Sequence, residues 1–354
     1  MRKFIKKLHL YTALVLFLPL VIQGLTGALL VFQHEISAKK YELSEGQRKP
    51  LAEIIEAARS QAPEGFKASS IRFDEAAIVR FSKRDGEKNM MREVVIDPVS
   101  LTVLEVKNPQ EYWLNLIKRF HASLLIKGDL GKNIVGIYGF VLLFMTISGL
   151  IIWWPKPGNL KRALTFKFSS EGKKFHRDLH SAVGFWSLIF LFITSFSGIY
   201  LIYPKGTHAF VASIFPARDL REIPQIEPNS NAAKIDEIIA IAKSENELKS
   251  IMIPSKPNQP YRLNFASKNH RDGEPLIVVF VDQYKREIIE ERNPSNYSLG
   301  EKILAWQHSL HEGSGFGLPY QIAVFLVGFL PLLFSITGIA LWWIKRKSKK
   351  LSKA

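Results

Sequence analysis

Four long apolar segments constrain this chain more than any other feature of its sequence. A helix needs roughly 20 apolar residues to cross a bilayer core about 30 Å thick. The four segments meet that requirement and cover residues 8–33, 134–154, 181–203 and 319–343. We therefore predict four transmembrane helices. We interpret the first as a retained anchor and not a cleaved signal peptide, because its apolar run is long and lacks an Ala-x-Ala-like site.

The composition fits a membrane protein with basic flanks. The chain is 47% apolar and has 48 Lys and Arg against 32 Asp and Glu, for a formal charge of +16. Nucleic-acid binding is not favoured, because no basic run is interleaved with aromatic residues away from the apolar segments. The chain has no cysteine, which excludes disulfides, Cys-ligated zinc, iron–sulfur clusters and covalently attached haem.

Basic residues also predict the orientation. They cluster in the first seven residues, in the segment 155–180 and in the C-terminal tail. Basic segments near helix ends stay in the cytoplasm. We therefore place both termini there and the two long polar regions on the opposite side.

The two halves of the chain repeat one pattern of helix, polar region and helix. Each apolar segment carries a Ser or Thr directly before a Gly: Thr26–Gly27, Ser148–Gly149, Ser197–Gly198 and Thr337–Gly338. Such a small pair lets a neighbouring helix or a flat cofactor approach the backbone. Ordinary helix packing is the alternative for any single pair.

The polar regions match each other as well. Residues 50–62 have an amphipathic helical pattern, followed by alternating runs and the hairpin EVVIDPVSLTVLEVKN. The second half has a helical pattern in NAAKIDEIIAIAKS, a strand at 261–265 and the hairpin IVVFVDQYKREIIEERN, with Asp282 in the place of Asp97. We expect each region to form a helix packed on a small antiparallel sheet.

Four histidines stand at the edges of the apolar segments. His9 and His180 each lie eighteen residues before the Gly of their own segment, which is five helical turns, so we expect each to share a face with that Gly. His121 and His311 each end a short amphipathic stretch before a spanning segment. Neutral imidazole is a common haem ligand, and two imidazoles give a centre suited to electron transfer. We predict one haem between His9 and His180 and a second between His121 and His311, with ordinary interfacial histidines as the alternative.

Other residues could replace or assist these ligands. His176, His308 and His34 are alternative ligands, and Arg119 and Arg177 are possible partners of the haem propionates. His208 and His270 are expected to be exposed to solvent. We assign no catalytic residue, and no nucleotide, flavin or zinc-protease motif stands in a suitable context.

The combination of these motifs resembles a known family. The hairpins look like those of PepSY domains, and LH…TG, RFHASLLIKGDLGKNIVG, DLHSAVGFW…SG and LHEGSGFGLP…TGIALWW resemble the PepSY-associated transmembrane family. The resemblance covers essentially the whole chain. It implies a bacterial inner-membrane protein with two haem b groups that reduces a periplasmic ferric siderophore and releases Fe(II). The electron donor would be quinol or a cytoplasmic reductase.

Two alternatives to this function remain open. A non-redox PepSY membrane module would bind peptides or proteases, and an accessory component would assist iron–siderophore uptake. On either view the four histidines would be interfacial residues.

The predicted fold class is membrane α-helical plus α+β, with four transmembrane helices in two tandem repeats. Each repeat has one periplasmic PepSY-like helix-and-antiparallel-sheet module. In chain order we expect a first membrane helix in 1–34, a periplasmic module in 35–110, an interfacial helix in 111–133, a second membrane helix in 134–154, a cytoplasmic loop in 155–180, a third membrane helix in 181–203, a second periplasmic module in 204–298, an interfacial helix in 299–318, a fourth membrane helix in 319–343 and a cytoplasmic tail in 344–354.

Overall fold

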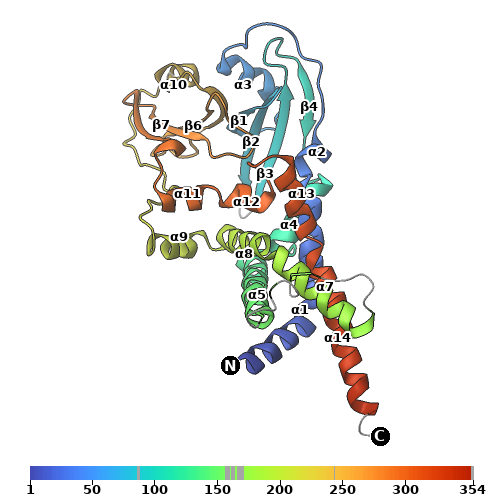
Figure 1. The fold of residues 1–354 in the computed structure, drawn as a ribbon. Helices are drawn as coiled ribbons and strands as arrows, with labels where there is room; N and C mark the ends of the chain where they lie inside the picture. The colour runs from blue at the N-terminus through green and yellow to red at the C-terminus, as the bar shows by residue number, and fades with distance from the viewer. Residues whose placement is uncertain (86–87, 156–159, 161–163, 166–170, 243, 352–354) are drawn as a thin grey trace. The chain divides into compact units, whose positions relative to one another are not determined.

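The structure is a computed structural model, and it describes the chain except for residues 86–87, 156–159, 161–163, 166–170, 243 and 352–354. Two compact units divide the chain (Figure 1). We call them the membrane unit, made of Met1–Ser37, Ile117–Val211 and Trp306–Ala354, and the sheet unit, made of Ala38–Leu116 and Ala212–Ala305.

The membrane unit is helical. Its helices are α1 (Arg2–Val31), α2 (Gln33–Ser37), α4 (Trp113–Ser123, which starts in the sheet unit), α5 (Asp129–Trp153), α7 (Gly172–Trp186), α8 (Leu188–Ile202), α9 (Pro204–Ala212), α12 (Gln307–Glu312), α13 (Leu318–Val327) and α14 (Leu330–Leu351). Three stretches are long and apolar enough to cross a membrane: Arg2–Val31, Asp129–Trp153 and Leu318–Ser348. The second begins five residues earlier than the sequence predicts, at Asp129.

The predicted single helix over 181–203 is instead a bent pair. α7 begins at Gly172, inside the segment expected to be a loop, and meets α8 at Ser187 with a bend of 62°. The Ser187 hydroxyl donates to the Val183 carbonyl over 2.7 Å, and side-chain bonds of this kind bend helices. Counting the pair as one span brings the described residues to four spans. Much of the basic loop that supports the predicted orientation lies outside the described residues, at 156–159, 161–163 and 166–170.

The sheet unit contains one antiparallel sheet of eight strands in the order β4-β3-β2-β1-β5-β6-β7-β8. Its strands are β1 (Lys67–Phe73), β2 (Ala77–Asp85), β3 (Lys88–Ile96), β4 (Val103–Lys107), β5 (Glu247–Met252), β6 (Tyr261–Ala266), β7 (Ile277–Asp282) and β8 (Glu287–Arg292). The prediction of two separate small sheets is therefore wrong. The edges meet where β1 pairs with β5, with Ile71 opposite Ile251, so each half of the chain completes the other's sheet.

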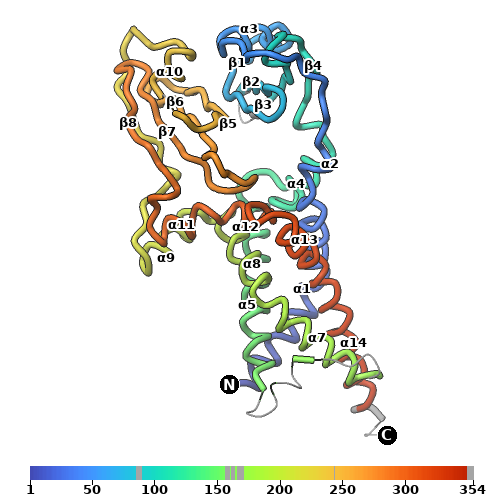
Figure 2. The backbone as a smooth tube through the Cα atoms, turned by 45° about the horizontal axis from the view of Figure 1, so that its top comes forward, coloured from blue at the N-terminus to red at the C-terminus, as the bar shows by residue number. Residues whose placement is uncertain are grey.

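Two helices cover one face of this sheet. α3 (Leu51–Arg59) and α10 (Ile235–Ala242) confirm the two predicted amphipathic helices, and both lie above the strands in Figure 2. Ile54 and Ile238 are fully buried in a single core with side chains from both halves. The Asp236 carboxylate accepts hydrogen bonds from the Leu51 and Ala52 N–H groups at 2.7 and 3.2 Å, so a residue of α10 caps α3.

The two predicted hairpins share one turn geometry. The buried carboxylates of Asp97 and Asp282 each accept a backbone N–H two residues ahead, at 2.9 and 2.8 Å. Four residues after each Asp, the backbone is left-handed, with φ of 64° at Leu101 and 57° at Arg286. This match supports the alignment of the two halves.

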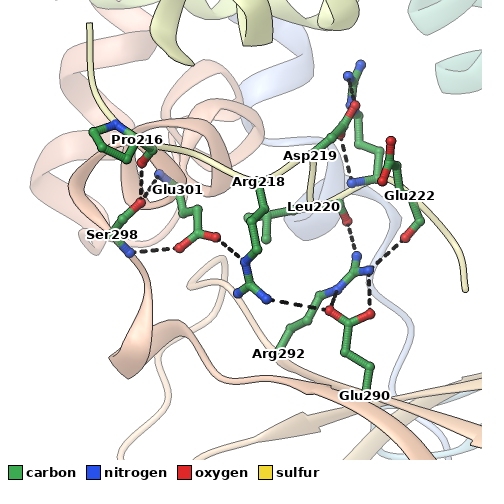
Figure 3. Close-up of polar contacts among 10 residues, drawn as sticks. Pro216, Arg218, Asp219, Leu220, Glu222, Glu290, Arg292, Ser298 and Glu301 are labelled. Carbon is green, nitrogen blue, oxygen red and sulfur yellow. Dashed lines mark hydrogen bonds and ion pairs between the residues drawn. The ribbon is translucent and has the colours of Figure 1, made fainter. Parts of the chain in front are cut away.

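A network of ion pairs fastens the segment after α9 to the sheet (Figure 3). Arg292 donates to both Glu290 oxygens at 2.8 Å and to the Leu220 and Glu222 carbonyls, and the guanidinium holds the pKa of Glu290 below its usual range. Arg218 donates to Glu301 at 2.6 Å. Glu301 and Ser298 form a capping box at the start of α11 (Leu299–Ala305), after the 3₁₀ helix η1 (Pro294–Asn296). A cavity of about 330 Å³ lies beside this network. Its two lining arginines, Arg218 and Arg292, are already paired with Glu290.

Candidate functional site

The four predicted histidines all lie in the membrane unit and share one arrangement. Each is partly buried, and each Nδ1 atom lies within hydrogen-bonding distance of the hydroxyl of one Ser/Thr–Gly pair. The four contacts are His9 to Ser148 at 2.8 Å, His180 to Thr337 at 2.7 Å, His121 to Thr26 at 3.0 Å and His311 to Ser197 at 3.1 Å. Each of the four Ser/Thr–Gly pairs therefore contacts one of the four histidines.

The hydroxyl partners of His9 and His180 lie on other helices, which the spacing within one segment does not address. His9 and His180 were expected to share a face with the Gly of their own segment, but each contacts a pair on another helix. A separation of eighteen residues corresponds to about 27 Å along a helix, so the Gly of the same segment lies too far away. Helical periodicity shows which face a residue occupies, but it does not show which neighbouring helix packs there.

The glycines beside His121 and His311 make room for the imidazole, whereas those beside His9 and His180 leave space for a Cβ atom. A Cβ atom on Gly27 or Gly198 would lie 3.1 or 3.0 Å from the Cε1 atom of His121 or His311, which is closer than ordinary van der Waals contact. The same atom on Gly149 or Gly338 would lie 3.7 or 4.0 Å from His9 or His180. The hydroxyl therefore orients each ring, while the glycine accommodates the rings of His121 and His311.

The histidines of the two halves approach each other. The ring centres of His121 and His311 are 6.2 Å apart, with an angle of 48° between the ring planes. Two imidazoles on one metal atom, each with a metal–nitrogen bond of about 2 Å, place their ring centres roughly 6 Å apart. His9 and His180 lie close enough to interact electrostatically. The spacing of His121 and His311 thus fits two imidazoles that share one metal atom.

Two of the three alternative ligands, His308 and His34, are exposed. His308 has a side chain 62% exposed and lies 3.4 Å from Glu312, and His34 is exposed in α2. His176 is partly buried one turn before His180, and its Nδ1 atom has no hydrogen-bond partner among the described residues.

The remaining predictions concern arginines and outlying histidines. Arg119 is exposed, and Arg177 pairs with Asp178 at 2.9 Å. The expectation that His208 and His270 are exposed is wrong. His208 is partly buried, and the His270 side chain is 10% exposed and lies 4.0 Å from Glu274.

Two residues that the sequence did not single out support the His121–His311 pair. Gln23 donates from its amide to the His121 carbonyl over 2.6 Å. Glu312 lies 3.4 Å from Lys118 on α4, so it links the helices that carry the two histidines. A polar Gln inside an apolar segment was the only available signal for the first, and the second had none.

Comparison with known families places this arrangement in context. The model of the PepSY-associated TM region matches residues 6–345. The chain belongs to this family. No curated protein matches it. The chain is thus a membrane protein of the PepSY-associated type, with apolar helices and an antiparallel sheet.

Proposed function

We propose that this PepSY-associated membrane protein is a di-haem b oxidoreductase that carries electrons across the membrane. The observation that carries the proposal is the fourfold arrangement in which a Ser or Thr hydroxyl holds the Nδ1 atom of each candidate ligand. Membership of this family is compatible with haem-binding oxidoreductase activity.

Each histidine pair would hold one haem through its Nε2 atoms. A bound haem supplies a one-electron Fe(III)/Fe(II) couple, and two imidazole ligands make it low-spin. His9 and the hydroxyl partner of His121, Thr26, lie seventeen residues apart on α1, which is about 25 Å along the helix. The two pairs therefore serve opposite ends of the same helix, and together they would shorten the distance that an electron must cross.

The proposed orientation follows from the basic residues of the sequence, the bacterial inner membrane from the family resemblance, and the tandem repeats from the internal duplication. Both termini would lie in the cytoplasm of a bacterial inner-membrane protein, with the α7–α8 pair as one of four spans in two tandem repeats. The sheet unit would lie in the periplasm. The donor would be quinol or a cytoplasmic reductase, and the acceptor a ferric siderophore. One electron converts its Fe(III) to Fe(II), which hard oxygen ligands hold less tightly because of its lower charge.

The absorption spectrum of the purified full-length protein tests the cofactor. Protein from haem-replete cells should show low-spin b-type bands on dithionite reduction, with two haems per chain. His180→Ala and His311→Ala should each remove about one haem, whereas His34→Ala serves as the matched control and should keep both. A colourless protein would overturn the proposal and favour a peptide-binding or protease-binding module.

The substrate requires its own experiment. Dithionite-reduced protein, freed of excess reductant, is mixed with a ferric hydroxamate siderophore, and Fe(II) is captured by a ferrous chelator. We expect oxidation of the haem bands and capture of Fe(II) in matching amounts. Haem bands that stay reduced in the presence of ferric siderophore would refute this substrate class while leaving the haem assignment intact.

A further inference from the structure

The four hydroxyl groups next to the histidines are each already committed as donors. A Ser or Thr hydroxyl carries one hydrogen and can accept further hydrogen bonds. Each of the four donates to a main-chain carbonyl of its own helix: Thr26 to Ile22 at 2.9 Å, Ser197 to Ile193 at 2.7 Å, Thr337 to Leu333 at 2.8 Å and Ser148 to Met145 at 3.3 Å.

The direction of the second hydrogen bond follows from this commitment. A hydroxyl that gives its hydrogen to the helix carbonyl can only accept from the imidazole, and the histidine would then carry its proton on Nδ1. His311 offers independent support, because its Nδ1 atom also lies 3.2 Å from the Thr194 carbonyl oxygen, which can only accept. The Nε2 lone pair of each ring is then free to ligate a metal.

We infer that Thr26, Ser148, Ser197 and Thr337 are positioning residues that fix the Nδ1–H tautomer of the four histidines and tune the haem potentials. This inference rests on the proposed haem function. A partner that accepts the outer N–H of a metal-bound imidazole raises the basicity of the ligand. A more basic ligand stabilises Fe(III) over Fe(II), so each hydroxyl lowers the potential of its haem.

The contacts also rank the four residues. Ser148, Thr337 and Thr26 make the hydroxyl contacts of His9, His180 and His121, and no second acceptor for those Nδ1 atoms is found in the described part of the chain. His311 would keep the Thr194 carbonyl after loss of Ser197. Removing the Ser197 hydroxyl should therefore shift its haem potential less than removing any of the other three.

The test compares Ser148→Ala, Thr337→Val, Thr26→Val and Ser197→Ala in the full-length protein. Matched controls remove a neighbouring hydroxyl that donates to its own helix but contacts no histidine: Thr146→Val on α5, Ser335→Ala on α14 and Ser195→Ala on α8. The measurements are haems per chain, potentiometric titration and the low-spin electron paramagnetic resonance signals.

We expect each site variant to raise the potential of one haem, to weaken its retention by about 10- to 100-fold and to leave the other haem unchanged. Ser148→Thr keeps the hydroxyl, so this variant should have the wild-type potential where Ser148→Ala does not. Loss of one haem in a site variant whose control keeps both also supports the inference. Unchanged potentials and signals, or equal losses in variant and control, would overturn it while leaving the haem function standing. A haem-free wild-type protein would refute the proposed function itself.

Discussion

The two units join the halves of the chain in different ways. In the sheet unit, main-chain hydrogen bonds between β1 and β5 make the junction, and Asp236 of one half caps a helix of the other. In the membrane unit, helix packing is supplemented by histidines that face each other across the halves, as His121 faces His311. The hydroxyl partner of each histidine lies in its own half. The sheet junction is made by main-chain hydrogen bonds, whereas the membrane junction brings imidazole side chains of the two halves together.

Removing haem should have the largest effect and should act on one unit only. We expect hydrogen exchange in α4, α8 and α12 of haem-depleted protein to rise well above that of loaded protein, because a ligand that binds only the folded site stabilises it. Amides of β1 and β5 should exchange at the same rate in both forms. Equal acceleration in both units would contradict the difference between the two junctions.

The converse change is Ile251→Ala, which truncates a fully buried side chain at the sheet junction. Such a truncation costs about 2–5 kcal/mol of unfolding free energy. Denaturant unfolding of the sheet, followed by circular dichroism, should move to lower denaturant while the haem bands stay unchanged. Ile288→Ala is the control, since that side chain is 44% exposed and its loss should cost little. Haem loss in Ile251→Ala would show that the junctions are coupled.

Adding a single methyl group should affect the two histidine pairs differently. Gly27→Ala places a methyl group 3.1 Å from His121, and Gly149→Ala places one 3.7 Å from His9. Overpacking typically costs about 1–3 kcal/mol, so only the first variant should weaken haem binding, at the His121–His311 site. Haem titration into depleted protein measures the effect. Gly198→Ala and Gly338→Ala should repeat the contrast in the other half, and similar losses from all four variants would disprove it.

Sequence periodicity was sufficient to predict a helix or hairpin whose formation depends on its own residues alone. It predicted the helices α3 and α10, the two hairpins and three of the four apolar spans, because the pattern of each lies within its own residues. It also selected His9, His121, His180 and His311, since repeated spacing in two halves is visible without a structure.

Features that depend on a second element were missed. The β1–β5 junction uses main-chain groups that every residue carries, so β5 leaves little trace in the side chains of ELKSIM. The break at Ser187 falls within an apolar run, where the spacing of apolar residues does not mark it. The hydroxyl partner of each histidine was not predicted for the same reason, because packing decides which neighbouring helix supplies it.

The turn aspartate Asp97 offers a pH-dependent change confined to the sheet unit. Asp97 is buried, which opposes its ionisation, but the N–H groups of Val99 and Ser44 and the Ser100 hydroxyl donate to it and hold its pKa well below the usual range. A carboxyl whose pKa is depressed in the folded state contributes its full stability above the unfolded pKa of about 3.9, and the contribution is lost as the pH falls from there through the folded pKa.

Asp97→Asn should therefore lower the unfolding free energy by about 1–3 kcal/mol at neutral pH, and the difference from wild type should shrink below about pH 4. Denaturant unfolding at several pH values measures both. Asp74→Asn, at an exposed carboxylate, is the control. Since Asp97 acts through a hairpin of the sheet unit alone, the haem content should not change. A loss of haem in Asp97→Asn, or a constant difference across the pH range, would contradict this assignment.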